Sequence, residues 1–195
     1  MRANKLSPAS DPRVTPDGAT IRQALAPADI ALARALFVEY AQWLNVDLCF
    51  QGFDAELNGL PGAYAPPRGR LLVVGPPRAA FGCIALRPLE PGCGCAPRDA
   101  GKADPRIGEV KRLYVQPGHR GERWGHRLAS TLIAHAIAIG YRQLKLDTLG
   151  RMEEARALYA KLGFRECPAY YDNPLPDVVY MSLDLSAGGA ASAAR

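Results

Sequence analysis

The chain has 195 residues, of which 48% are hydrophobic, and it carries a formal net charge of +5 at pH 7. These values fit one domain with a substantial core, and the charge favours anionic partners without choosing between phosphorylated cofactors, nucleic acid and acidic membrane. No apolar run reaches the roughly 18 to 20 residues that cross a bilayer, and residues 1–18 lack the apolar centre of a secretory signal, so we expect a cytoplasmic protein without a membrane partner.

Hydrophobic spacing predicts alternating strands and helices between two tails. In chain order these are the strand Ala19–Leu25, the helices Ala28–Asn45 and Cys49–Leu60, the hairpin strands Arg70–Val74 and Ala79–Leu86, the strand Ile107–Val115, the helix Gly125–Ile139, the strand Gln143–Thr148, the helix Glu153–Leu162, and the strands Phe164–Cys167 and Val178–Leu185. This alternation indicates α/β layers. Residues 19–185 are expected to form a single domain, with residues 1–18 and 186–195 as disordered tails because they offer little apolar surface to bury.

A Pro- and Gly-rich loop is expected over Glu90–Pro105, and it contains Cys93 and Cys95. Five cysteines are an odd number in a chain too large to depend on disulfides, which fits free thiols in a reducing compartment. No further Cys or His lies nearby to complete a tetrahedral metal site with this pair, so no metal is expected.

The most informative segment begins where the strand ending in Leu113–Val115 runs into a turn, the sequence RGERWG over 120–125, and then a helix. Such a turn exposes backbone N–H groups and the positive end of the helix dipole, which suits a pyrophosphate. The glycine spacing differs from the dinucleotide and P-loop patterns, and an ordinary tight turn is the alternative.

Together with a second motif, this segment resembles the GCN5-related N-acetyltransferase (GNAT) family. Arg120 and Gly125 match the ends of its R/Q-x-x-G-x-G/A pattern, while Arg123 stands where the middle glycine is usual. The sequence ARALYAKLGF over 155–164 is similar to the family's downstream signature, with Met152 where a cofactor-contacting Asn is common. The resemblance covers residues 19–185 and is strongest over 108–164.

The resemblance implies a mixed sheet of about seven strands flanked by about four helices, with the fourth and fifth strands splayed so that the arm of acetyl-CoA inserts between them. It implies that the backbone of one strand pairs with the pantetheine arm and that the following turn holds the pyrophosphate. The implied cofactor-binding residues are Leu113, Tyr114 and Val115 on the strand, and Arg120, Gly121, Glu122, Arg123, Trp124, Gly125 and His126 in the turn and helix.

Transfer of an acyl group to an amine requires removal of a proton from an ammonium of pKa about 10.4 and protonation of a thiolate whose thiol has a pKa of about 8.5. By resemblance, Tyr159 is the proton donor to the sulfur and Glu109 the base, with Asp147 as the alternative base. Packing beneath the helix is the competing interpretation for Tyr159, and an ion pair with Lys111 for Glu109. No Ser/His/Asp order indicates a covalent acyl-enzyme, so direct attack is favoured.

The acceptor is expected to be a small primary amine. Candidate acceptor residues are Phe50, Arg112 and Tyr171, together with Trp43 and Tyr170, and Arg112 could clamp an acceptor carboxylate. The alternatives are a protein or peptide amine as acceptor and a non-catalytic acyl-CoA sensor. A nucleic-acid partner is not expected because no clustered basic stripe is present, and a homodimer is compatible with the sequence.

Overall fold

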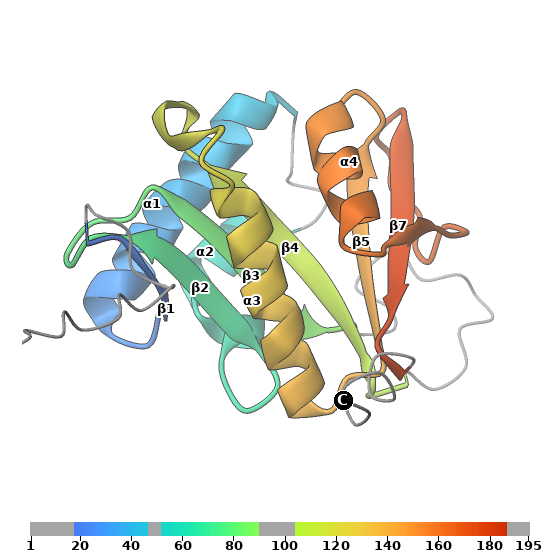
Figure 1. Cartoon of the computed structure of the whole chain (residues 1–195), viewed down its shortest axis with the longest axis horizontal. Coiled ribbons are helices and arrows are strands. Elements are labelled where there is room, and N and C mark those ends of the chain that lie inside the picture. Colours follow the sequence, from blue (N-terminus) through green and yellow to red (C-terminus); the bar gives the residue numbers. More distant parts are fainter. Residues whose placement is uncertain (1–17, 47–51, 90–103, 187–195) are drawn as a thin grey trace, which may run out of the picture.

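A seven-stranded sheet with helices on both faces forms the protein (Figure 1). The computed structural model describes residues 18–46, 52–89 and 104–186; Phe50, the Cys93/Cys95 pair and nearly all of both expected tails lie outside these ranges. The elements are β1 (Thr20–Gln23), α1 (Pro27–Leu44), α2 (Phe53–Gly59), the 3-10 helix η2 (Gly62–Tyr64), β2 (Arg70–Gly75), β3 (Gly82–Pro88), β4 (Ile107–Val115), the 3-10 helix η3 (Pro117–His119), α3 (Trp124–Ile139), β5 (Gln143–Leu149), α4 (Glu153–Lys161), β6 (Arg165–Glu166) and β7 (Val178–Asp184).

Most predicted boundaries agree with these elements within one or two residues, and the exceptions lie next to turns. β3 begins at Gly82 instead of Ala79 because Ala79 closes a turn by donating its N–H to the Pro76 carbonyl oxygen. α2 begins at Phe53 instead of Cys49, because Gly52 is its N-cap residue and adopts a left-handed conformation, φ 68°; residues 49–51 lie outside the described ranges. β1 is shorter than predicted at both ends, and β6 retains two of the four residues expected over Phe164–Cys167.

The strand order is β1-β2-β3-β4-β5-β7-β6, and all neighbours are antiparallel except β4 and β5. Parallel pairing of β4 with β5 covers only Ile107–Glu109 against Gln143–Lys145. Figure 1 shows the two strands together at one end and diverging toward the other. The expected splay between the fourth and fifth strands is therefore confirmed, and it leaves the β5-facing edge of β4 without a strand partner beyond Glu109.

A β-bulge lies in the splayed part of β4. Cys83 pairs with Tyr114 and Ala85 with Lys111, so Arg112 and Leu113 together face Ile84. Arg112 adopts a left-handed conformation, φ 59°. A bulge of this kind bends a strand and changes the direction of its side chains, and this one lies where β4 departs from β5.

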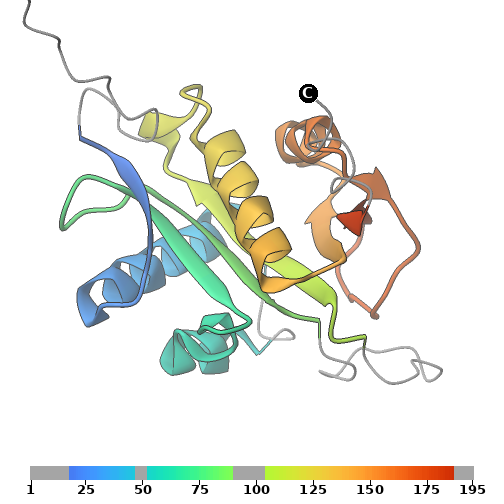
Figure 2. The same cartoon turned by 60° about the horizontal axis from the view of Figure 1, so that its bottom comes forward.

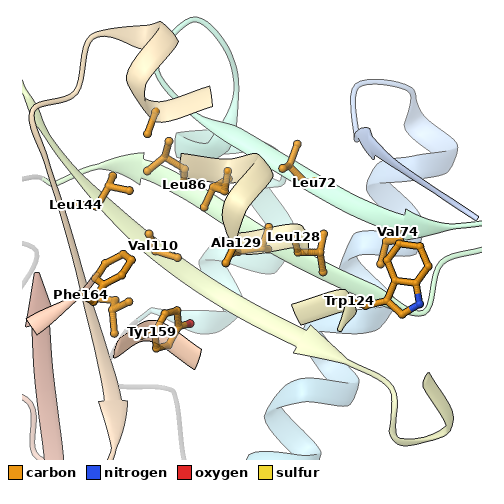
Figure 3. Packing of buried hydrophobic residues seen from close by; sticks show 14 of the residues in the cluster. Leu72, Val74, Leu86, Val110, Trp124, Leu128, Ala129, Leu144, Tyr159 and Phe164 are labelled. Carbon is orange, nitrogen blue, oxygen red and sulfur yellow. The ribbon is translucent and has the colours of Figure 1, made fainter. Parts of the chain in front are cut away.

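Two hydrophobic clusters hold the helices to the sheet, with α1 and α2 on one face and α3 on the other (Figure 2). α3 packs Leu128, Ala129 and Leu132 onto the sheet, at the spacing of one helical face. Figure 3 shows this cluster extending from Trp124 at one end to Tyr159 and Phe164 at the other. α3 and α4 thus pack on the same face of the sheet, on either side of the splay.

Candidate active site

An open groove of about 860 Å³ runs along the splayed end of the sheet. Its walls are the end of β4, the turn before α3 with the first residues of α3, and the first turns of α4, and Trp43 of α1 lies at its rim. Four cationic side chains line the groove, against two carboxylates. They are Arg120, Arg123, Arg151 and Lys161, and the carboxylates are Glu153 and Glu154. The excess of positive charge suits an anionic ligand.

The N-terminus of α3 presents unpaired backbone amides to this groove. Arg123 is its N-cap residue, in a left-handed conformation with φ 62°, and no side chain caps the helix. Gly121 also has a positive φ, 86°, which a residue without Cβ adopts easily. At Gly125 a Cβ would lie 3.2 Å from Leu158 Cδ1 of α4, so glycine here leaves space between the two helices. Uncapped amides at the positive end of a 16-residue helix form an anion site.

A small chamber of about 60 Å³ opens from the inner end of the groove. The two cavities share Leu113, Met152 and Ala155, so they meet at the bulge of β4 and the start of α4. The polar side chains of the chamber come from α1, β4, β5 and α4. They are Tyr40, Lys111, Arg112, Asp147, Thr148 and Tyr159. This volume holds only a few water-sized groups, so the chamber is a small recess beside the groove.

Tyr159 faces the chamber from α4. Its side chain is 7% exposed, and its ring packs edge-to-face on Phe164 at 5.5 Å between centroids. Its hydroxyl donates no hydrogen bond to any other residue that the structure describes. Burial raises the pKa of Tyr159, with smaller contributions from Tyr40 and Asp147. The hydroxyl is therefore protonated at neutral pH and able to donate its proton to a ligand in the chamber.

Lys111 and Asp147 form a buried ion pair across the splay, with 2.8 Å between Lys111 Nζ and Asp147 Oδ1. Asn173 donates to the other carboxylate oxygen of Asp147 at 3.3 Å. Burial would raise the pKa of Asp147, but the charge and hydrogen bond of Lys111 outweigh it and lower the pKa below its usual value. The chamber therefore holds an ionised carboxylate at neutral pH.

Glu109 lies behind this pair and does not line the chamber. Its Oε2 accepts from Arg87, at 2.8 Å from Nε and 2.7 Å from Nη2. Its Oε1 accepts from the Tyr170 hydroxyl at 3.1 Å and lies 3.5 Å from Lys111 Nζ. Both oxygens are thus engaged, and Glu109 supports the position of Lys111.

Arg112, the bulge residue, points toward α2 and binds Glu56 through two nitrogens. Nε and Nη2 donate to the two carboxylate oxygens at 3.0 and 2.7 Å, and the Arg112 side chain is 3% exposed. Burial would lower the pKa of Arg112, but Glu56 outweighs it and raises the pKa. This bidentate pair occupies the part of the guanidinium that an acceptor carboxylate would use.

Comparisons with known proteins agree on one family. The family model described as the acetyltransferase (GNAT) family matches residues 46–164. An N-acetyltransferase of Schizosaccharomyces pombe is 37% identical over 172 residues, which cover 88% of this chain and 98% of that protein. The chain belongs to the GNAT family. An N-acetyltransferase of Dictyostelium discoideum is 28% identical over 200 residues, covering 78% of this chain and 93% of the relative.

A solved GNAT structure has the same fold. The acetyltransferase yncA of Salmonella typhimurium, solved with its cofactor acetyl-CoA, has a TM-score of 0.61 and 20% identity over 90% of this chain and 99% of its own. The expected GNAT fold is therefore confirmed, and this protein is an acetyl-CoA-dependent N-acetyltransferase. The groove fits this cofactor, since the uncapped amides of α3 and the cationic side chains suit a diphosphate, and the unpaired edge of β4 suits an amide-bearing arm.

Most of the cofactor residues expected from the sequence surround this GNAT groove. Nine of the ten line it: Leu113, Tyr114, Val115, Arg120, Gly121, Arg123, Trp124, Gly125 and His126. Glu122 instead accepts a hydrogen bond from Trp124 Nε1 at 2.9 Å and lines a neighbouring pocket. Arg127 packs over the Trp124 ring at 3.9 Å.

The expected acceptor residues are more scattered. Trp43 lies at the rim of the groove under the Arg120 guanidinium, 4.5 Å from its ring centroid. Tyr170 and Tyr171 pack with Tyr180 beside the Glu109 and Asp147 carboxylates and do not line the chamber. Phe50 lies outside the described residues.

Several residues that line the GNAT site were not singled out from the sequence, including Lys111, Tyr40 and Arg151. Lys111 and Tyr40 line the chamber, and Arg151 lines the groove while its Nη2 donates to the Leu44 carbonyl oxygen at 2.7 Å. A lysine at the centre of the apolar strand Ile107–Val115 was the available signal for Lys111. Tyr40 matched the apolar face of its helix, and nothing separated it from core residues.

None of the helices within the described ranges is long and apolar enough to cross a membrane. The same part of the chain contains no cluster of three or more His, Cys, Asp or Glu side chains suited to a metal ion.

Proposed function

We propose that this enzyme transfers the acetyl group of acetyl-CoA to the primary amine of a small molecule, by direct attack in the chamber beside the groove. The observation that carries the proposal is the chamber itself. It joins the groove at Leu113, places Tyr159 on one wall and Asp147 on another, and has about 60 Å³ of free space. An acceptor confined there meets the acyl group delivered along β4 with few alternative orientations, which favours reaction by proximity.

We propose that Asp147 binds the acceptor amine and that Glu109 has a supporting role. Among the described residues, Asp147 is the one carboxylate that lines the chamber, and it is ionised at neutral pH. An incoming ammonium can therefore share the charge of Asp147 with Lys111 and pass a proton to solvent. Glu109 is 3% exposed and engaged by Arg87 and Tyr170. It maintains the charge balance around Lys111.

We propose that Tyr159 donates the proton that the departing thiolate requires. When bound, acetyl-CoA supplies an activated acyl carbon and a thiolate leaving group. The Tyr159 hydroxyl has no competing partner among the described residues, and its raised pKa keeps it protonated over the working range. General acid catalysis by a positioned side chain typically contributes roughly 10² to 10⁴ in rate.

The acceptor class is tested with a panel of small amines, amino acids and peptides, in an assay that detects release of the CoA thiol. We expect turnover of at least one small amine and little or none of peptides, because only a few non-hydrogen atoms fit beyond the attacking nitrogen. Turnover confined to peptides would instead establish a protein or peptide acceptor. A protein that binds CoA but transfers acetyl to no amine would be an acyl-CoA sensor.

The choice of base is tested by comparing Asp147→Asn with Glu109→Gln. We expect Asp147→Asn to lower kcat/KM for the amine at least tenfold while the Kd for CoA changes little. Glu109→Gln is expected to act mainly on stability, because it removes a buried charge that pairs with Arg87 and lies 3.5 Å from Lys111. Loss of turnover in Glu109→Gln at unchanged melting temperature would reverse the two assignments.

A further inference from the structure

Lys111 is a primary amine inside the chamber where, in the proposed function, acetyl groups are delivered. Its side chain is 7% exposed and lines the same small cavity as Tyr159 and Asp147. Of the lysines that the structure describes, Lys161 lines the outer groove and only Lys111 lines the chamber. Lys111 is thus chemically equivalent to an acceptor and lies at the place where an acceptor would bind.

The surrounding charges keep this amine unreactive. Burial alone would lower the pKa of Lys111, but the Asp147 and Glu109 carboxylates outweigh it and raise the pKa. The other charged and titratable groups around Lys111 are Arg112, Arg87, Tyr171 and Tyr40. At neutral pH its nitrogen is therefore an ammonium without a lone pair, held 2.8 Å from Asp147.

We propose that Lys111 is a self-acetylation site, protected by Asp147, at which the enzyme modifies itself when acetyl-CoA is bound and no acceptor amine is present. The nitrogen first loses one proton to Asp147 or solvent and then attacks the thioester carbon. The N–C bond forms as the C–S bond breaks, and CoA leaves as the thiol after receiving a proton from Tyr159. The nitrogen then loses its second proton, which restores the Tyr159 hydroxyl, so one proton is released to solvent overall. Acetyl-CoA is the only co-reactant.

Acetylation of Lys111 would inactivate the enzyme in two ways. The amide has no charge, so Asp147 and Glu109 would lose their cation in a buried site. The added acetyl group would also fill much of the 60 Å³ that an acceptor needs. The modification would therefore couple activity to the supply of acceptor amine, and the inference rests on the proposed function of the chamber.

The test is peptide mass spectrometry of the full chain after incubation with acetyl-CoA in the absence of any amine. The fraction of acetylated Lys111 is compared between the wild type and Asp147→Asn. Two lysines serve as internal references for chemical acetylation by free acetyl-CoA: the exposed Lys161, and Lys145, which lines neither the groove nor the chamber. We expect Asp147→Asn to increase acetylation at Lys111 at least tenfold and to leave Lys161 unchanged. Adding Tyr159→Phe to Asp147→Asn should lower the Lys111 signal again.

A second measurement uses the wild type alone, in case Asp147→Asn does not fold. Below the pKa of Lys111, the fraction of free amine rises about tenfold per pH unit, so acetylation of Lys111 should increase steeply between pH 7.5 and 9.5. After this incubation the acetyl-CoA is removed, and turnover of the amine is measured with fresh substrates. That turnover should fall in proportion to the fraction of Lys111 that is acetylated.

Failure of this inference is distinguishable from failure of the proposed function. If Lys111 remains no more acetylated than Lys161 in both measurements while the wild type turns over a small amine, self-acetylation is refuted and the proposed function stands. If Lys111 is acetylated but no small amine is turned over, self-acetylation stands and the small-amine acceptor is refuted.

Discussion

Replacing Tyr159 by Phe removes one oxygen atom from the wall of the chamber and tests the proposed proton donor. The ring can keep its edge-to-face contact with Phe164, and the lost hydroxyl has no described hydrogen-bond partner, so the free energy of unfolding should change by less than about 1 kcal/mol. Without the donor, the thiolate must leave unprotonated or wait for water. We expect kcat to fall about a hundredfold, which corresponds to ~2.7 kcal/mol of activation free energy.

The assay is thiol release under saturating acetyl-CoA, with Kd for CoA and melting temperature measured on the same preparation. Tyr141→Phe is the matched control, because Tyr141 is also buried, at 3% exposure, and loses a hydrogen bond to the Arg68 carbonyl oxygen far from the chamber. The control should lose about 1 kcal/mol of stability and retain its turnover. Near-normal kcat in Tyr159→Phe would refute the role of the hydroxyl, and a large loss of stability would mean that the effect reflects packing.

Three further predictions concern the groove, the chamber and the Arg112–Glu56 ion pair. Arg120→Ala should raise the Kd for CoA about tenfold, because it removes a charge-assisted contact of ~1.5 kcal/mol, and the effect should be smaller at high salt. The control Arg165→Ala, outside the groove, should leave the Kd unchanged. Equal CoA titration curves for the two variants would contradict this prediction. In the wild type, kcat/KM for the amine should rise from pH 7 to 9, because Asp147 holds the acceptor as an ammonium, and a flat profile would exclude that binding mode. Glu56→Gln should cost about 3 kcal/mol, or roughly 6 to 12 °C in Tm at pH 7, because it leaves Arg112 buried without a counter-charge. Burial would raise the pKa of Glu56, but Arg112 outweighs it and lowers the pKa in the folded protein. The stabilisation is therefore present above the unfolded pKa of about 4.3 and is lost as the pH falls through the lower pKa of the folded state. A difference in Tm between wild type and Glu56→Gln that persists well below pH 4 would refute the linkage.

The sequence predicted the elements that carry strong local signals. β4 has the predicted bounds Ile107–Val115, because its apolar spacing is clear. α3 begins one residue earlier than predicted, and its end is marked by the following Gly140. The turn over 120–125 was predictable for the same reason, because its glycines and arginines lie close together in the chain.

The interior of the site depends on contacts between residues far apart in the chain, and no local pattern encodes them. Lys111 and Asp147 are 36 residues apart, and Arg112 and Glu56 are 56 apart. The bulge that turns Arg112 toward α2 occurs at a non-glycine residue with positive φ, which the sequence does not mark. The expectation that Arg112 clamps an acceptor carboxylate thus depended on the direction of its side chain, which only the register of β3 and β4 reveals.

The short ladder between β4 and β5 makes the sheet two blocks. β5 shares seven paired positions with β7 but only three with β4, so β5, β7 and β6 form one block and β1 to β4 the other. In the proposed complex, the arm of acetyl-CoA hydrogen-bonds to the free edge of β4 and contacts α4 across the groove. The bound cofactor therefore connects the two blocks at a second place. Saturation at 100 times Kd adds about 2.7 kcal/mol to the unfolding free energy, and amide exchange in β7, remote from the ligand, should slow together with that in β4.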